Sequence, residues 1–164
     1  MSGAAFRRDL EELVPALRRY ARALTRERET ADDLVQDTLV RALRSEHLFH
    51  GGSLRNWLYT ILTNLDRNRR RAAARRPVLV PVEDEADGGN ATAAERRDIA
   101  RALSLLDAAQ REALLLVVLE GLSYRDAAEV QGVPIGTVMS RIARARANMK
   151  DFLDGERPRL RQVK

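Results

Sequence analysis

The sequence contains no cysteine and only two histidines, so it lacks the residues that build disulfides, thiol nucleophiles and most zinc sites. Aromatic residues make up 4% of the chain. The longest apolar run, Ala113 to Leu119, is far shorter than the ~20 residues that cross a bilayer. The first residues include acids where a signal peptide needs an apolar stretch. We therefore expect a cytoplasmic protein with no metal, no cofactor and no membrane segment.

Charge is abundant and unevenly distributed along the 164 residues. The net charge of +5 divides into +6 for residues 1–76, −4 for residues 77–100 and +3 for residues 101–164. Most of the cations are arginine, whose planar guanidinium suits phosphate groups and guanine edges. A GC-rich genome would produce the same bias. Two basic blocks therefore flank an acidic strip, which favours two small domains over one.

Apolar residues recur at three- and four-residue steps through the first block, and this spacing predicts helices. Pro15 interrupts the first stripe and predicts a kink or a fresh start there. Thr30 is a candidate N-cap for a second helix that continues to about Arg44, and Ser53 is a candidate N-cap for a third. The first stripe contains Phe6, Leu10, Leu13, Val14, Leu17, Ala21 and Leu24. Residues 1–76 are thus predicted to form a compact three-helix domain.

Residues 77–94 have prolines, clustered acids and a Gly-Gly-Asn turn but no apolar period, so we predict a flexible acidic linker. Helical periodicity resumes in residues 95–164, with Gly121 as a helix-terminating glycine. The fold class predicted for the whole chain is all-α, with two small helical domains joined by this linker.

The second domain contains the most specific local pattern in the sequence. Ser123 can cap a short helix that continues to Val130, and a turn containing Gly132 follows. A longer helix then opens at Pro134 and continues to about Leu153. A capped short helix, a glycine turn and an arginine-bearing helix predict a helix-turn-helix.

The second helix of such a motif enters the DNA major groove. Helical spacing places one set of side chains outward, namely Thr137, Ser140, Arg141 and Arg144. The same spacing turns Val138, Ile142 and Ala145 inward, while Arg146 and Lys150 fall where phosphate contacts are expected. These arginines could instead merely solvate an exposed face. A single small motif also buries little surface, so tight binding needs a second contact or a partner.

The first domain offers a candidate for that second contact. Trp57 and Tyr59 follow a glycine loop that contains Phe49 and His50, and an arginine tract lies beyond them. Aromatic rings beside cations are typical of sites that hold unstacked single-stranded bases. On composition alone, Trp57 and Phe49 are better explained as core residues, whereas we expect Tyr59 to be exposed.

The pattern of carboxylates and histidines does not suggest an enzyme. The carboxylates gather at helix starts and in the linker, no paired histidine accompanies them, and no glycine-rich phosphate loop is present. We therefore expect neither covalent catalysis nor a small-molecule ligand.

Three stretches resemble the extracytoplasmic-function (ECF) group of the sigma-70 family, which are bacterial transcription initiation factors. They are ADDLVQDTLVRAL (residues 31–43), SLRNWLYTILTN (residues 53–64) and REALLLVVLEGLSYRDAAEVQGVPIGTVMSRIARARANM (residues 111–149). Within the family, the sequence of these stretches resembles the subgroup associated with the alphaproteobacterial general stress response. The resemblance implies three partners: core RNA polymerase, through its beta-prime clamp helices and beta flap; promoter DNA; and an anti-sigma factor.

The resemblance also implies roles for individual residues. Asp33, Gln36 and Asp37 match positions that dock on the beta-prime clamp helices. The loop from Leu48 to Ser53 matches the part that captures a flipped base of the −10 element, with His50, Trp57, Tyr59 and Asn64 as the implied −10 contacts. Met139, Ser140, Ala143 and Arg144 match positions that read the −35 element, which adds to the outward Thr137 and Arg141.

Two departures from the family pattern concern these same segments. The loop between Phe49 and Trp57 is one residue shorter than is common, which affects the identity of the captured base. Met139 and Ala143 replace longer side chains.

The sequence thus predicts a sigma factor that directs core RNA polymerase to promoters and helps to melt the −10 region. One alternative is a sigma-like decoy that occupies an anti-sigma factor without binding DNA. Another is a conventional helix-turn-helix repressor, which would bind duplex DNA without polymerase.

Overall fold

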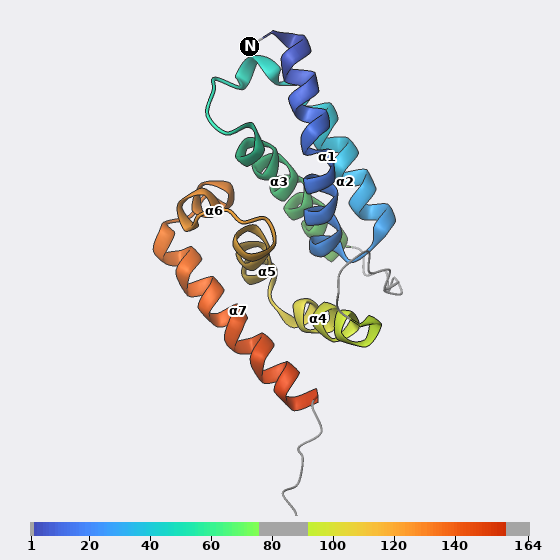
Figure 1. Cartoon of the computed structure of the whole chain (residues 1–164), viewed down its shortest axis with the longest axis vertical. Helices are drawn as coiled ribbons and strands as arrows, with labels where there is room; N and C mark the ends of the chain where they lie inside the picture. Colours follow the sequence, from blue (N-terminus) through green and yellow to red (C-terminus); the bar gives the residue numbers. More distant parts are fainter. Residues whose placement is uncertain (1, 76–91, 157–164) are drawn as a thin grey trace, which may run out of the picture.

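The computed structural model describes residues 2–75 and 92–156, which form helices joined by short turns and contain no strand (Figure 1). The predicted all-α fold class is confirmed for this part of the chain. The first helical unit consists of α1 (Gly3–Thr25), α2 (Arg28–Arg44), the short 3-10 turn η1 (Glu46–Leu48) and α3 (Leu54–Ala74). The second helical unit consists of α4 (Ala93–Leu105), α5 (Ala108–Leu114), the π-helical turn η2 (Leu115–Leu119), α6 (Tyr124–Gln131) and α7 (Ile135–Glu156).

The first unit is a three-helix bundle whose core contains most of the predicted stripe, although Leu13 and Val14 are only half-buried. Phe6, Leu10 and Leu17 of α1 are buried against α2 and α3. Inside this core the hydroxyls of Tyr20 and Thr63 share a hydrogen bond of 2.8 Å. Burying both hydroxyls is tolerable because each satisfies the other.

Two local expectations for the first unit are decided by the structure, and the one for the N-cap of α2 is wrong. Of the kink or fresh start expected at Pro15, the fresh start does not occur, because α1 continues through it. Pro15 lies on the exposed side of α1, where water can satisfy the carbonyl that loses its partner. The N-cap of α2 is Glu27 rather than Thr30, because α1 ends in a tight turn with Arg26 at φ 59° and α2 starts directly after it. The Thr30 hydroxyl instead donates to the Glu27 carboxylate at 2.8 Å.

The other predicted helix ends are confirmed. Ser53 and Ser123 cap α3 and α6, each accepting a backbone N–H three residues along the chain. Gly121 and Gly132 adopt left-handed conformations after η2 and α6. α4 begins at Ala93 with a capping box between Thr92 and Glu95. Of the predicted linker, residues 77–91 lie outside the described residues.

The helix that precedes Gly121 widens before it ends. In η2 the N–H of Glu120 donates to the carbonyl of Leu115 at 3.0 Å, and the N–H of Leu122 donates to that of Leu116 at 3.0 Å. These bonds span five and six residues instead of four. Single π-helical turns of this kind are rare and often occur at functional sites.

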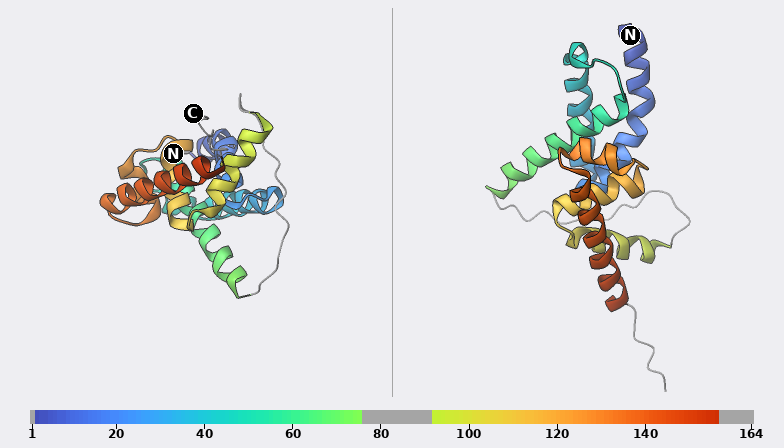
Figure 2. Two further views of the ribbon diagram at one scale, coloured as in Figure 1. Left: turned by 90° about the horizontal axis from the view of Figure 1, so that it is seen from below. Right: turned by 90° about the vertical axis from the view of Figure 1, so that its left-hand side faces the viewer.

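The two helical units pack against each other (Figure 2). α6 contacts α3, and η2 contacts α1, so one apolar core continues from the first unit into the second. None of the helices in the described ranges is long and apolar enough to cross a membrane.

Candidate nucleic-acid interface

α6, its glycine turn and α7 form the predicted helix-turn-helix. Gly132 ends α6 at φ 68°, and the N–H of Val133 then donates to the carbonyl of Ala128 at 3.0 Å. Val138 and Ile142 of α7 are buried, as is Ala145, so the predicted inward face is confirmed. These contacts fix which side of α7 points away from the protein.

The outward face of α7 carries the residues singled out from the sequence. Met139, Ser140 and Arg144 are exposed, as is Ala143, whereas Thr137 and Arg141 are half-buried. The Ser140 hydroxyl donates to the Gly136 carbonyl at 3.1 Å. Among the described residues neither Arg141 nor Arg144 has an ion-pair partner, which leaves both guanidinium groups available to a ligand.

The outward face of α2 combines acids with apolar groups. Asp33, Gln36 and Asp37 are all exposed, on the side opposite the buried Leu34, Val35 and Thr38. Val40 and Leu43 follow on the same helix and are 40% and 44% exposed. Exposed apolar side chains beside charges are a feature of protein docking surfaces.

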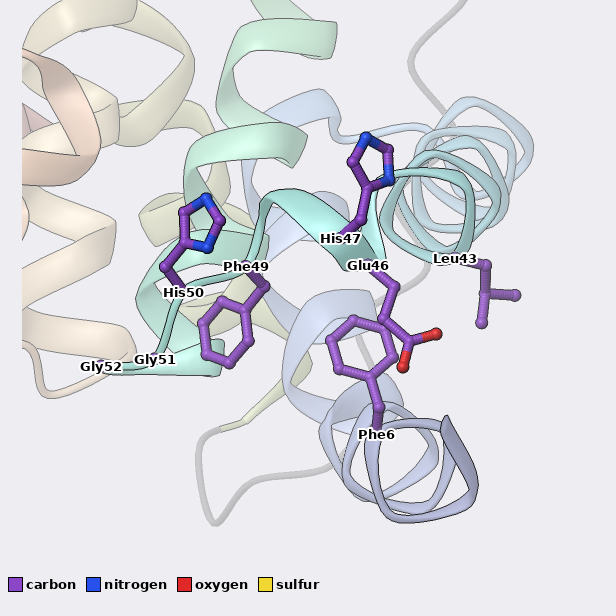
Figure 3. Close-up of a pocket in the computed structure, with 8 residues that line it drawn as sticks. All are labelled: Phe6, Leu43, Glu46, His47, Phe49, His50, Gly51 and Gly52. Carbon is purple, nitrogen blue, oxygen red and sulfur yellow. The ribbon is translucent and has the colours of Figure 1, made fainter. Parts of the chain in front are cut away.

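The loop before α3 borders a hollow of about 890 Å³ (Figure 3). The hollow is lined by Phe6, Leu43, Glu46, His47, Phe49, His50, Gly51 and Gly52. Gly51 and Gly52 have φ values of 98° and 85°, which glycine adopts far more readily than other residues. His50 is exposed at the loop, whereas the Trp57 ring is half-buried, 5.4 Å from that of Phe49 and 6.3 Å from that of Phe6. Phe49 and Trp57 therefore belong to the edge of the core.

The expectation that Tyr59 is exposed is wrong, because the second unit covers it. Its side chain is completely buried, and its hydroxyl donates to the Glu120 carboxylate at 2.5 Å. Its ring meets the Tyr20 ring edge-on at 5.2 Å. Burial, together with the bond to Glu120, raises the pKa of Tyr59 above its ordinary value. Asn64, one and a half turns further along α3, is exposed.

Glu120 forms the centre of a cluster that joins the two units. Arg19 of α1 donates to both of its carboxylate oxygens, at 2.9 Å and 2.7 Å. Arg55 of α3 donates to the Glu120 backbone carbonyl, lies 3.5 Å from its carboxylate, and stacks over the Tyr59 ring at 5.3 Å. The hydrogen bond to Glu120 is the main cause that raises the pKa of Arg19.

Glu112 forms a second cluster, about two helical turns before Glu120 in the chain. Arg67 and Arg70 of α3 donate to its carboxylate at 2.8 Å and 2.6 Å. Arg70 also bonds Asp66, and the amide of Gln131 donates to Glu112 at 3.1 Å. The carboxylate side chains of Glu112 and Asp66 are each 2% exposed, so the negative charge of this cluster is buried.

Sequence reasoning missed both clusters. The available signal was that Glu112 and Glu120 bracket the apolar run of residues 113–119, so that helical spacing brings them near the core. Arg67 and Arg70 are three residues apart and thus share a face of α3. Nothing local identified the partners, which are 42 to 101 residues away.

Comparison with known proteins gives matches to both units. Residues 10–63 match the family model described as the Sigma2 domain of PhyR, and residues 96–149 match the model described as Sigma-70, region 4. The ECF RNA polymerase sigma factor EcfG of Rhodopseudomonas palustris (strain TIE-1) is 41% identical over 160 residues, which cover 91% of this chain and 85% of EcfG. The ECF RNA polymerase sigma factor SigM of Mycobacterium tuberculosis is 39% identical over 140 residues, covering 84% of this chain and 71% of SigM.

Solved structures agree. The sigma factor RpoE of Bartonella quintana, in complex with the anti-sigma factor NepR, is 35% identical with a TM-score of 0.78, covering 93% of this chain and 99% of RpoE. CnrH, in complex with the cytosolic domain of CnrY, is 31% identical with a TM-score of 0.73. The match covers 94% of this chain and 91% of CnrH. The matches to EcfG and RpoE are consistent with the general-stress subgroup. With sigma factors matched along nearly its whole length, this chain belongs to the ECF sigma factors of the sigma-70 family.

Proposed function

We propose that this chain binds core RNA polymerase and directs it to promoters by contacting the −35 element with its second unit and the −10 element with its first. The observation that carries the proposal is the helix-turn-helix of α6 and α7, whose outward arginines have no ion-pair partner among the described residues, in a chain that matches sigma factors. No covalent catalysis is involved, and the site of action is the cytoplasm.

The −35 contact is assigned to the outward face of α7. Arg144 can form a bidentate pair with a guanine edge, and Ser140 can bond either purines or pyrimidines. Met139 and Ala143 offer apolar contact to thymine methyl groups. Thr137 and Arg141 lie beside them and complete the reading face, while Arg146 fits the phosphate backbone.

The −10 contact is assigned to His50, Trp57, Tyr59 and Asn64. The hollow at the glycine loop is bordered by aromatic rings and the exposed His50 imidazole, which suits a base that has left its stack. Extruding one base costs a few kcal/mol, and a prepared aromatic pocket offsets that cost. Contact with Tyr59 requires the two units to separate, because Glu120 covers it in the closed arrangement.

Polymerase docking is assigned to the exposed face of α2, through Asp33, Gln36 and Asp37 on the beta-prime clamp helices. Val40 and Leu43 add apolar area to the same face. The second unit would meet the beta flap. Residues 1–76 and 95–164 then act as two domains, and residues 77–94 as the acidic linker between them.

An anti-sigma factor is a further proposed partner. RpoE was solved with the anti-sigma factor NepR, and CnrH with the cytosolic domain of CnrY. A protein that covers the exposed apolar residues of this chain would regulate it in a comparable way.

The two alternative functions are less well supported. The first-unit model is named after PhyR, and a PhyR structure is described as an anti-anti-sigma factor, which is the kind of protein that the decoy hypothesis describes. However, the curated relatives that match along most of the chain are sigma factors, so the decoy is not favoured. A repressor would not need the exposed acidic and apolar face of α2.

Run-off transcription with purified core polymerase tests the proposal. Adding this chain should produce a promoter-specific transcript from native templates, and core enzyme alone should not. Complete absence of specific transcripts on all native templates would contradict a sigma function. Duplex binding without polymerase in a gel shift would support the repressor instead.

A further inference from the structure

Two buried carboxylates of the second unit, Glu120 and Glu112, receive nearly all of their hydrogen bonds from side chains of the first unit. Every side-chain hydrogen bond of Glu120 found among the described residues goes to α1 or α3, from Arg19, Arg55 and Tyr59. The carboxylate is completely buried, yet it has no partner within its own unit. Its placement therefore makes sense only while the two units are together, since a buried carboxylate without a cation is strongly disfavoured.

Glu112 also binds across the contact, although Gln131 of its own unit donates to it as well. Its two oxygens receive guanidinium groups from Arg67 and Arg70 of α3, at distances of 2.6 to 3.3 Å. Two carboxylates of the second unit thus hold three α3 arginines, counting Arg55, which are spread over four turns of that helix.

The geometry of these pairs is that of arginine bound to phosphate. A guanidinium group forms parallel N–H bonds to two oxygens of a carboxylate or a phosphate in the same way. The arginines lie on α3, the helix that also carries Trp57, Tyr59 and Asn64. When the units separate, both carboxylates return to water and the arginines become available to an anionic strand.

We propose that Glu120 and Glu112 substitute for nucleic-acid phosphates and hold α3 closed against single-stranded DNA, so that the free chain inhibits its own −10 contact. This inference rests on the proposed function, because it assumes that α3 binds the −10 strand. Closure and DNA binding compete for the same arginines and for Tyr59. The apparent affinity of the free chain for a single strand is lowered by the fraction of molecules that are open.

Glu120→Gln is the variant of choice, because it removes the charge without removing any hydrogen bond inside the second unit. The absence of cysteine in the sequence allows dyes to be placed at Glu11→Cys in α1 and Lys150→Cys in α7. Energy transfer between the dyes should fall in Glu120→Gln, which reports separation of the units. Affinity for a fluorescent single-stranded oligonucleotide should rise about 10-fold as the open fraction grows.

Two further variants separate closure from general electrostatics. Glu12→Gln removes the same charge from an exposed position on α1 and should change affinity less than twofold. Arg19→Gln removes a cation, which by itself weakens DNA binding. Because it also loosens the hold on Glu120, we expect it to strengthen single-strand binding about threefold. Because the Arg19 side chain is half exposed, Arg19→Gln should fold normally. It can therefore be used for the test even if circular dichroism shows that Glu120→Gln is unfolded.

The outcomes are distinct for the inference and for the proposed function. Unchanged energy transfer in Glu120→Gln and Arg19→Gln, or separation without a gain in affinity, overturns the inference. If the wild-type chain still supports promoter-specific run-off, the proposed function survives that result. A gain in affinity in both variants supports the inference, even where wild-type run-off fails and the proposed function falls.

Discussion

Nη2 of Arg19 and Oε2 of Glu120 lie 2.7 Å apart, although 101 residues separate the two in the sequence. The pair is uneven, because the Arg19 side chain is 50% exposed and that of Glu120 is completely buried. Removing the Arg19 guanidinium therefore leaves a buried carboxylate with fewer partners, and the cost in free energy comes from burying that charge. The contact between the units combines such pairs with an apolar core, and we expect it to be sensitive to changes on either side.

Stability should fall at alkaline pH because of the two buried tyrosines. Burial raises the pKa of Tyr20 and Tyr59 above 10 in the folded chain. An unfolded tyrosine loses its proton near pH 10, so above that pH the unfolded state releases more protons and is stabilised relative to the folded state. The contribution is intact below about pH 10 and is lost as the pH rises. Urea denaturation at about pH 9 and pH 11 should show the loss, and Tyr20→Phe should reduce the slope.

The glycine turn of the helix-turn-helix should tolerate no side chain without cost. Gly132→Ala meets no atom within 4 Å, so its cost comes from the φ of 68° alone. We expect the free energy of unfolding to fall by about 1–2 kcal/mol. Gly136→Ala is the matched control: it also meets nothing within 4 Å but has no positive φ, so stability should stay equal or rise by up to about 1 kcal/mol. Equal effects in urea denaturation would contradict this account.

Arg144→Ala should weaken recognition of the −35 element. The side chain is exposed on the outward face of α7, so the fold should be unaffected. Loss of a bidentate base contact costs about 1–3 kcal/mol in binding to the cognate promoter. Holoenzyme binding to cognate and scrambled −35 DNA measures the difference. An equal loss on both would identify Arg144 as a phosphate contact.

Charge reversal on α2 should impair polymerase binding. Asp33→Arg with Asp37→Arg changes two exposed residues of the proposed docking face. Because like charges at an interface replace attraction with repulsion, affinity for core polymerase should fall at least about 10-fold in a competition assay. Glu11→Arg with Glu12→Arg makes the same charge change on α1 and should have a much smaller effect. A similar loss in both double variants would argue against α2 as the docking face.

Features that depend on local chemistry could be predicted from the sequence. The caps Ser53 and Ser123, the left-handed Gly132 and the inward face of α7 all follow from residues within one or two turns. Local rules failed at Thr30, because the tight turn at Arg26 starts α2 earlier and places Glu27 at the N-cap.

Burial of Tyr59 could not be predicted, because it depends on a contact with a residue 61 positions later in the chain. The sequence pattern of α3 places Tyr59 beside the base-binding candidates. Its hydroxyl contacts Glu120 of the second unit, and nothing in the pattern of α3 indicates that contact. Long-range pairs between charged residues leave no periodic signal, which explains why Glu112 and Glu120 were not singled out.

The π-helical turn of η2 fixes the direction in which Glu120 points, because the N–H of Glu120 bonds the carbonyl five residues back. Each residue turns an α-helix by about 100°, so regular α-helical winding of the same residues would rotate Glu120 away from Arg19. Every charged residue would remain in the sequence, yet the two units would lose the ionic cluster around Glu120. Two relatives with identical charges could therefore differ in whether they close, through the winding of a single helical turn.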